Sequence, residues 1–139
     1  LSGKNIDNDN IELISLINKY DLGGCVYLMG LVKDMPLFMS SIDLLVNNSF
    51  SESFSLILAE ALLCETLCIS TIEGDPESMI DGIGIHVPAG NVTLLSNAIV
   101  KILSNESFKG NKTKGRQKII SLYSVEKVLK LYESLYTQN

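Results

Sequence analysis

Two glutamates, Glu52 and Glu60, flank a serine-rich stretch, and their spacing is the clearest chemical signal in the sequence. The stretch reads as a polar loop that enters a helix at about residues 53–56, where Ser53 or Ser55 can cap the helix. The first turn of such a helix has unpaired N–H groups and the positive end of the helix dipole, which together bind anions. Glu60 then lies about one turn inside the helix, where its carboxylate can accept hydrogen bonds from a diol. The pattern fits a phosphate, a sugar or a ribose, and it also fits a capped helix with two surface carboxylates.

This loop belongs to an alternation of short apolar runs with stretches of helical period. The predicted strands are residues 25–29, 43–47, 67–70 and 84–87, and the predicted helices are residues 10–20, 34–41, 53–63, 75–82, 91–103, 107–122 and 124–136. Such alternation predicts an α/β, Rossmann-like parallel sheet with helices on both faces. Ligands of these sheets bind beyond the carboxyl ends of the strands. The segments to inspect are therefore residues 30–34, 47–55, 71–76 and 88–91.

Local signals mark several helix starts. Asp34 and Asn91 are predicted caps, and so is Asp75, which is followed by a proline suited to the first helical position. Glu73 and Glu77 flank this last start. Either could touch a sugar, although an acidic residue at a helix start also explains Glu77.

The composition bounds the class of protein. The chain has 139 residues, 46% of them apolar, and a net charge of −5. This length favours one domain, here residues 1–139, and the apolar content excludes a disordered chain. The acidic balance argues against a nucleic-acid partner, which needs clustered Lys and Arg, although backbone amides can still hold a single nucleotide.

Other features indicate a reducing compartment. No apolar run reaches the ~18 residues of a membrane span, and no signal-peptide pattern opens the chain. Cys25, Cys64 and Cys68 have no CxxC spacing, and we interpret them as small buried apolar residues. His86, the single histidine, is interpreted as structural.

The sequence also resembles a known family. The segment Ser49-x-x-Glu52-Ser53-Phe54-Ser55-Leu56, followed by Glu60-Ala61, resembles the E-x7-E signature of retaining glycosyltransferases with the two-domain GT-B architecture, especially glycosyltransferase family 4. The similarity extends over about residues 1–136. It includes the segments Val26-Tyr27-Leu28-Met29-Gly30, Gly74-Asp75-Pro76-Glu77 and Gly84-Ile85-His86-Val87-Pro88.

The resemblance implies the C-terminal, nucleotide-sugar-binding half of such an enzyme. It implies a catalytic role for Glu52 near the transferred sugar, and contact between Glu60 and the ribose hydroxyls. Backbone amides at the helix start would face the diphosphate or the sugar, and the nucleobase would pack beside the glycine-ended strand. The residues with these backbone amides are Ser53, Phe54, Ser55 and Leu56, and the residues beside the nucleobase are Gly30, Leu31 and Val32.

The resemblance also implies parts beyond this sequence. The family's first strand–helix unit and its N-terminal acceptor domain should precede Leu1, so we expect a fragment that does not turn over alone. The expected partners are a nucleoside-diphosphate sugar and that acceptor domain. No cofactor or metal is expected, because the helix N-terminus does part of the work of a magnesium ion. The resemblance further implies a cytoplasmic protein that can reach the inner face of the membrane through the missing half, and a role in capsule or lipopolysaccharide assembly.

The leading hypothesis is a retaining transfer of sugar to a glycan or lipid-linked acceptor, and other functions stay open. Ser53 and Ser55 stand where the family usually has glycines, which keeps open a degenerate, non-catalytic module that only binds a nucleotide or a partner. The spacing of Glu52 and Glu60 argues against a nucleotide-sugar epimerase half. A receiver-like signalling module needs an acidic cluster at a strand end, whereas Asp43 opens its strand.

Overall fold

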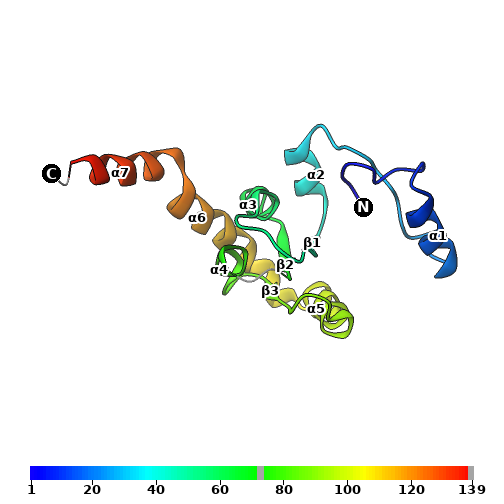
Figure 1. The fold of residues 1–139 in the computed structure, drawn as a ribbon. Helices are drawn as coiled ribbons and strands as arrows, with labels where there is room; N and C mark the ends of the chain where they lie inside the picture. The colour runs from blue at the N-terminus through cyan, green and yellow to red at the C-terminus, as the bar shows by residue number, and fades with distance from the viewer. Residues whose placement is uncertain (72–73, 138–139) are drawn as a thin grey trace. The chain divides into compact units, whose positions relative to one another are not determined.

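The structure is a computed structural model that describes residues 1–71 and 74–137. Its contacts group the chain into two compact units, Leu1–Phe38 and Met39–Asn139. Figure 1 shows the helices and strands of both. The single domain expected over residues 1–139 stays a prediction.

The unit Leu1–Phe38 contains helix α1, Ile11–Lys19, and the start of helix α2, Met35–Ser41. Asn10 caps α1, because its side-chain oxygen accepts a hydrogen bond from Leu13 N at 3.0 Å. Asp34 caps α2 in the same way, accepting from Leu37 N at 3.0 Å. Both helices and the Asp34 cap confirm the sequence prediction, since a short polar side chain at this position satisfies a free amide.

Residues 25–29, predicted as a buried strand, do not form a strand. Leu1 N donates to Tyr27 O at 2.8 Å and Met29 N donates to Leu1 O at 2.9 Å, which makes one bridge of a parallel pair. The pairing then becomes irregular, with Gly3 N donating to Gly30 O at 2.8 Å, so no ladder forms. Tyr27 and Met29 are 70% and 56% exposed. The prediction is wrong because a buried parallel strand needs a ladder beside it and cover on both faces.

The unit Met39–Asn139 is built on a parallel three-stranded sheet in the order β1-β2-β3. The register pairs Asn47 with Ser70, and Ser70 with His86. These strands confirm three of the predicted ones, and their parallel order confirms the α/β, Rossmann-like fold class. The strands are β1, Leu44–Asn47, β2, Leu67–Ser70, and β3, Ile85–His86.

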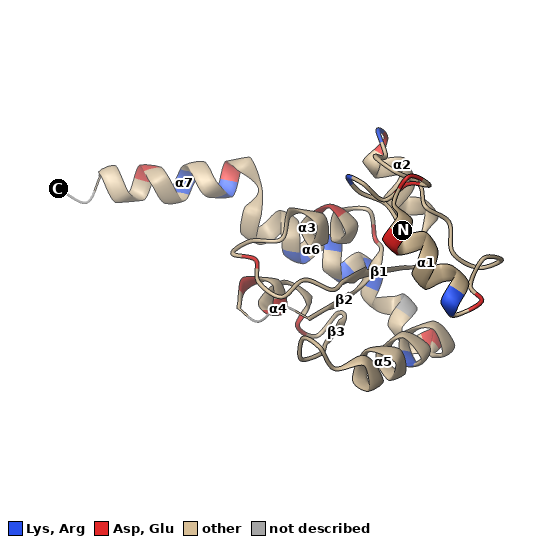
Figure 2. Cartoon of the chain, turned by 45° about the vertical axis from the view of Figure 1, so that its right-hand side comes forward, with Lys and Arg blue, Asp and Glu red and all other residues tan. Residues whose placement is uncertain are grey.

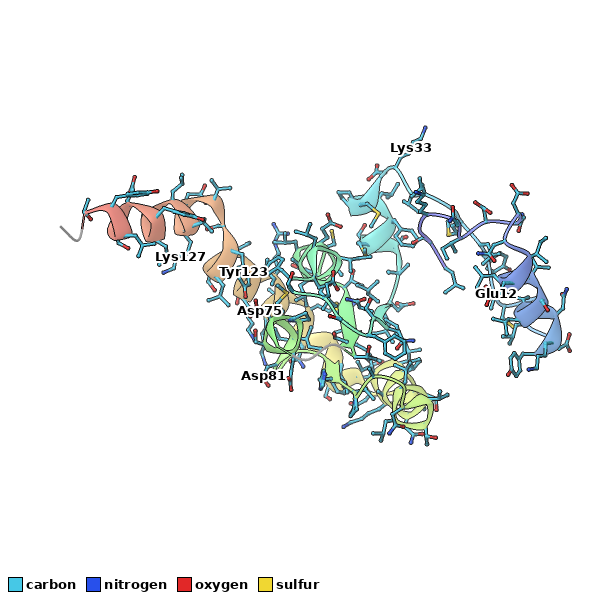
Figure 3. The ribbon with its side chains drawn as sticks, in the orientation of Figure 1. Glu12, Lys33, Asp75, Asp81, Tyr123 and Lys127 are labelled. Carbon is cyan, nitrogen blue, oxygen red and sulfur yellow. The ribbon has the colours of Figure 1, made fainter. Side chains whose placement is uncertain are left out.

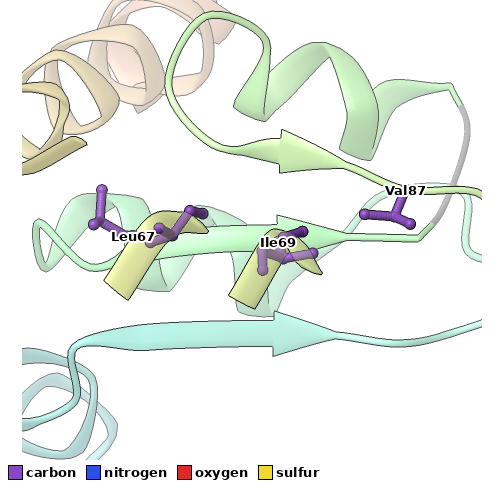
Figure 4. Close-up of a cluster of buried hydrophobic side chains, with 5 residues drawn as sticks. Leu67, Ile69 and Val87 are labelled. Carbon is purple, nitrogen blue, oxygen red and sulfur yellow. The ribbon is translucent and has the colours of Figure 1, made fainter. Parts of the chain in front are cut away.

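Helices cover both faces of this sheet, as Figures 1 and 4 show. Helices α3, Leu56–Leu63, and α4, Asp75–Ile80, pack on one face, and α5, Val92–Ser104, packs on the other. The chain then passes through the 3-10 helix η1, Glu106–Asn111, into its last two helices, α6 and α7. These are Lys112–Tyr123 and Val125–Tyr136. None of the helices formed by the described residues combines the length and apolar character needed to cross a bilayer.

Alternate residues of β2 supply the two sides of the core. Leu67 and Ile69 point towards α5 and pack with Val87, Ala98 and Ile102, the cluster drawn in Figure 4. On the other side, α3 and α4 contribute side chains that are at most 1% exposed: Leu58 and Leu62 from α3, and Met79 and Ile80 from α4. Burying one such aliphatic side chain stabilises the folded chain by about 1.5–3 kcal/mol. The helices on both faces are therefore held against the sheet.

The start of α4 differs from the prediction. Gly74 is the N-cap residue with φ 92°, so Asp75 is the first helical residue and Pro76 the second. This positive φ suits glycine, which has no Cβ to clash. The carboxylate of Asp75 therefore lies in the first turn, where the helix dipole favours negative charge. Figure 3 labels Asp75 and Asp81, the first residue of α4 and the residue that follows its end.

Basic side chains of helix α6 bind the free carbonyls at the carboxyl ends of α3 and α4. The Arg116 guanidinium donates to Leu63 O at the end of α3. The Lys118 ammonium donates to Ser78 O at 2.6 Å and to Asp81 O at 3.1 Å at the end of α4. Cations are favourable at helix carboxyl ends because free carbonyls and the dipole are negative there. Figure 2 shows the basic residues of α6 in blue.

Candidate functional site

Three loops lie at the carboxyl edge of the sheet, one after each strand. Thr71 N donates to Asn47 O at 3.1 Å and Val87 N donates to Ser70 O at 3.0 Å, so the strand ends are aligned. The loop after β1, residues 48–55, leads into α3 and carries Glu52. A small cavity of about 60 Å³ lies among the three loops. Its lining includes Asn48, Phe50, Thr71, Pro88 and Asn91.

Asn47, the last residue of β1, organises the loop that follows it. Its side-chain Nδ2 donates to Glu52 Oε2 at 3.2 Å and to Ser55 Oγ at 2.8 Å. Its Oδ1 accepts from Ser49 Oγ at 3.1 Å, and Ser49 O in turn accepts from Thr71 Oγ1 at 2.8 Å. Asn47 is 9% exposed, and its bond to Ser55 is buried while the other three bonds are partly buried. The network ties the loop to the ends of both β1 and β2.

Ser55 is the N-cap residue of α3, but its hydroxyl does not cap the helix. The side chain is fully buried and its Oγ is bonded to Asn47 instead. The expectation that Ser53 or Ser55 caps is therefore wrong, because no side-chain hydrogen bond caps this helix and the Ser55 hydroxyl is bonded to the Asn47 amide. The helix start carries no side-chain cap and no acidic residue in its first turn. Its first N–H groups are left for solvent or for an anion.

The two glutamates lie in different surroundings. Glu52 is half-buried in the loop and is held by Asn47. Glu60 is exposed and lies one turn inside α3, as its spacing predicts. Within residues 1–71 and 74–137, no hydrogen bond or ion pair engages the Glu60 carboxylate. The structure thus has one carboxylate fixed by a neighbour and a second that is open to a ligand.

The remaining residues of the helix start divide between packing and exposure. Phe54 stacks edge-to-face on Tyr123 of α6, with ring centroids 5.2 Å apart and the planes at 78°. Its ring therefore anchors the loop to Tyr123 of α6. Ser53 is exposed in the loop, and Leu56 is 67% exposed at the first helical position.

Gly30, Leu31 and Val32 belong to the unit Leu1–Phe38, not to the unit that contains Glu52 and Glu60. Gly30 has φ 62°, and its N–H donates to Ile6 O at 2.7 Å. Leu31 is 74% exposed. Contact of these residues with a nucleobase stays a prediction.

A larger cavity of about 330 Å³ lies between α4 and β3. Glu77 Oε1 is 3.6 Å from His86 Nδ1 in its lining, and His86 Nε2 is buried without a hydrogen-bond partner among the described residues. Glu52, Glu60 and the start of α3 do not contribute to it. Glu73, the other glutamate singled out near this helix, lies outside the described residues.

The cysteines and acidic residues do not form a metal site in the part of the chain that the structure describes, where no three His, Cys, Asp or Glu side chains converge. Burial raises the pKa of the Cys68 thiol to about 12, which keeps it neutral at physiological pH. The interpretation as a buried residue is confirmed for Cys68 and is wrong for Cys25, which is exposed, and for Cys64, which is only half-buried at the end of α3.

Sequence reasoning missed the residues that hold the loop: Asn47, Ser49 and Thr71. The available signal is the placement of Asn47, a polar residue that ends an apolar strand immediately before the loop. A side chain at that position can form hydrogen bonds with the loop that follows it. Which acceptor it chooses depends on the path of the loop, which the spacing of residues does not reveal.

The structure is thus an α/β domain with a loop and an uncapped helix start at the carboxyl edge of its parallel sheet. The chain belongs to the family Glycosyl transferases group 1, which matches residues 2–105. It is 26% identical over 127 residues to N-acetyl-alpha-D-glucosaminyl L-malate synthase of Bacillus anthracis, with 89% of this chain covered. The chain spans 33% of the length of that relative.

Two solved structures are similar in fold. HepE of Anabaena in complex with UDP-glucose superposes with a TM-score of 0.83 at 21% identity, over 99% of this chain and 40% of that one. Sucrose-phosphate synthase from Thermosynechococcus elongatus superposes with a TM-score of 0.80 at 24% identity, over 94% of this chain and 35% of that one. Both confirm the α/β fold class.

Proposed function

We propose that the chain is the donor-binding, C-terminal domain of a retaining family 4 glycosyltransferase, which moves a sugar from a nucleoside-diphosphate sugar to a glycan or lipid-linked acceptor. The observation that carries the proposal is the uncapped start of α3 with one carboxylate fixed beside it and another exposed one turn inside. A diphosphate suits free amides at a helix N-terminus, and a ribose diol suits an exposed carboxylate.

In this proposal each group has a separate task. The first-turn amides of α3, after Ser53, Phe54, Ser55 and Leu56, bind the diphosphate. Glu60 accepts hydrogen bonds from the ribose hydroxyls, and Gly30, Leu31 and Val32 lie near the base. Glu52 is placed at the transferred sugar, where its charge favours the positive character that develops at the anomeric carbon.

The reaction we propose is a same-face displacement. The bond between the anomeric carbon and the diphosphate oxygen breaks, and the acceptor oxygen bonds to that carbon from the same face. The proton of the acceptor hydroxyl passes to the leaving diphosphate. Donors already aimed at the leaving group stabilise its developing charge without reorganisation, which is the role of the α3 amides.

The proposal includes a partner domain. The chain spans 33% of the length of the Bacillus anthracis relative and 40% of the length of the Anabaena structure. These shares support the proposal that an acceptor-binding domain completes the site in the whole enzyme. Turnover is therefore expected of the protein that carries both domains.

Nucleotide titration of the chain tests the proposal. UDP, GDP and ADP are added in turn while amide NMR shifts are followed, starting with UDP because the Anabaena structure holds UDP-glucose. We expect millimolar binding at best, roughly −4 kcal/mol, with shifts at the amides of residues 56–58. Hydrogen bonds to a charged group contribute about 1.5–3 kcal/mol, so Glu60→Ala should weaken binding about ten-fold or more.

Glu133→Ala is the matched control, since Glu133 is also an exposed helical glutamate, on α7. It should leave the affinity within about two-fold of the native value. The proposal fails if no nucleotide shifts the α3 amides, or if the two glutamate variants bind alike. Binding in the complete protein without any transfer would instead support a module that only binds nucleotide.

A further inference from the structure

The side chain of Asn47 connects the two features on which the proposed site depends. One N–H of its amide bonds Glu52, and the other bonds Ser55 at the N-cap of α3. A carboxylate can only accept, so the nitrogen of the amide must face Glu52, and this fixes the orientation of the group. The remaining oxygen accepts from Ser49, which locks the amide in place.

The bond to Ser55 has a consequence for the helix. A serine at an N-cap position ordinarily accepts a hydrogen bond from the second or third helical N–H, here Ile57 or Leu58. The buried hydroxyl of Ser55 is bonded to Asn47 instead, and no cap bond forms. The amide group that holds Glu52 therefore also holds the Ser55 hydroxyl, at a helix start that has no side-chain cap.

We propose that Asn47 is a positioning residue for the donor site: it orients Glu52 and, by engaging Ser55, keeps the first-turn amides of α3 open to the diphosphate. The inference rests on the proposed function for the identity of the anion. The competition between Ser55 and the anion is a property of the chain itself, and it can be measured without a ligand.

The first experiment uses amide hydrogen exchange of the chain without nucleotide. In Asn47→Ala the Ser55 hydroxyl is released, and a serine cap contributes about 1 kcal/mol. Exchange at Ile57 or Leu58 should therefore slow about five-fold. The double variant Asn47→Ala with Ser55→Ala should return exchange to the native rate, because no hydroxyl is left to cap the helix.

The second experiment measures UDP affinity in the same variants. Asn47→Ala should bind about five-fold more weakly, because the anion must displace the new cap. Adding Ser55→Ala should restore part of the affinity, which a residue needed only for stability would not do. Asn47→Asp keeps the shape of the side chain but has no N–H donor, so exchange at Ile57 or Leu58 should slow as in Asn47→Ala. Its added negative charge itself opposes a bound anion, so this variant is judged by exchange and by the effect of adding Ser55→Ala, not by its UDP affinity alone. Asn111→Ala, which removes a bond to Ile83 O at 3.3 Å, is the matched control and should change neither readout.

The outcomes separate the two proposals. Native protein that binds no nucleotide overturns the proposed function, while the exchange data still decide whether Asn47 diverts Ser55. Unchanged exchange in both Asn47 variants, or a double variant that behaves like Asn47→Ala, overturns the inference even if UDP binds. If Asn47→Ala does not fold, Asn47→Asp with and without Ser55→Ala decides the matter by the same criteria.

Discussion

Gly84 lies directly before β3, where its backbone passes close to the central strand. A Cβ added at this position would be 2.2 Å from Cys68 O, 3.2 Å from Cys68 C and 3.3 Å from Ile80 Cβ. Real Cβ contacts shorter than 3.0 Å are essentially never seen, so at least 0.8 Å must open. The obstacle is the carbonyl of β2, which has β1 on one side and β3 on the other. It cannot retreat without disturbing the sheet.

Gly84→Ala is therefore expected to destabilise the chain. Overpacking costs about 1–3 kcal/mol, and a backbone obstacle places this site at the upper end of that range. The smaller entropy of the unfolded alanine chain offsets about 0.4–1 kcal/mol. We expect a net loss of about 2 kcal/mol in the free energy of unfolding.

Urea unfolding followed by far-UV circular dichroism measures this loss as a lower midpoint with an unchanged slope. Gly110→Ala is the matched control, because a Cβ at Gly110 meets nothing within 4 Å and Gly110 has no positive φ. It should leave the stability unchanged or raise it by up to about 1 kcal/mol. A Gly84→Ala midpoint equal to that of Gly110→Ala would show that β3 is not held against β2 as described.

Three further predictions concern the side chains of Cys68 and Phe54. Because burial raises the pKa of Cys68 to about 12, a thiol reagent at pH 8 should label Cys25 in folded protein and Cys68 only after unfolding. Equal labelling of both would contradict the burial. The Cys68 thiol loses its proton from about pH 9 in the unfolded chain but keeps it in the folded chain. The free energy of unfolding should therefore fall as the pH rises above 9. Cys68→Ala should remove the share of this decrease that comes from the Cys68 thiol. Phe54→Leu removes the edge-to-face contact with Tyr123 and should cost about 0.5–1.5 kcal/mol in urea unfolding; the same loss in a Tyr123→Leu background would show that the rings are not coupled.

Sequence periodicity predicted the sheet and helices of the unit Met39–Asn139 well. The strands at residues 43–47, 67–70 and 84–87 each end in a polar or turn-forming stretch, and each is followed by a helix. A short apolar run predicts a strand that is covered on both faces, and a period of 3.6 predicts a helix with one buried face, so both signals succeed where helices cover the sheet. The same reasoning failed for residues 25–29, because an apolar run signals burial only when a ladder and two covering layers are present.

The candidate site was predictable in its carboxylates but not in its hydrogen bonds. Glu60 lies one turn inside a helix because it is eight positions after Glu52 and the helix begins at Leu56, so helical geometry converts spacing into position. The prediction of a side-chain cap at Ser55 was wrong because hydrogen-bond partners do not follow from spacing. Residue type alone favours a serine cap, and only the path of the loop reveals that Asn47, eight positions earlier, reaches the same hydroxyl.

The two ends of α3 explain why its start is suited to an anion. The carboxyl end is neutralised by Arg116 of α6, which donates to Leu63 O. The amino end has no cap from Ser55 and no acidic residue in its first turn. A helix has partial charges of about +0.5 and −0.5 at its ends, and among the described residues a side chain is bonded to the negative end but none caps the positive end. The positive end therefore remains uncompensated beside Glu52, whose own carboxylate is turned to Asn47. An anion bound there would complete the charge balance of α3, which ties the binding of a diphosphate to the packing of α6 as well as to the loop.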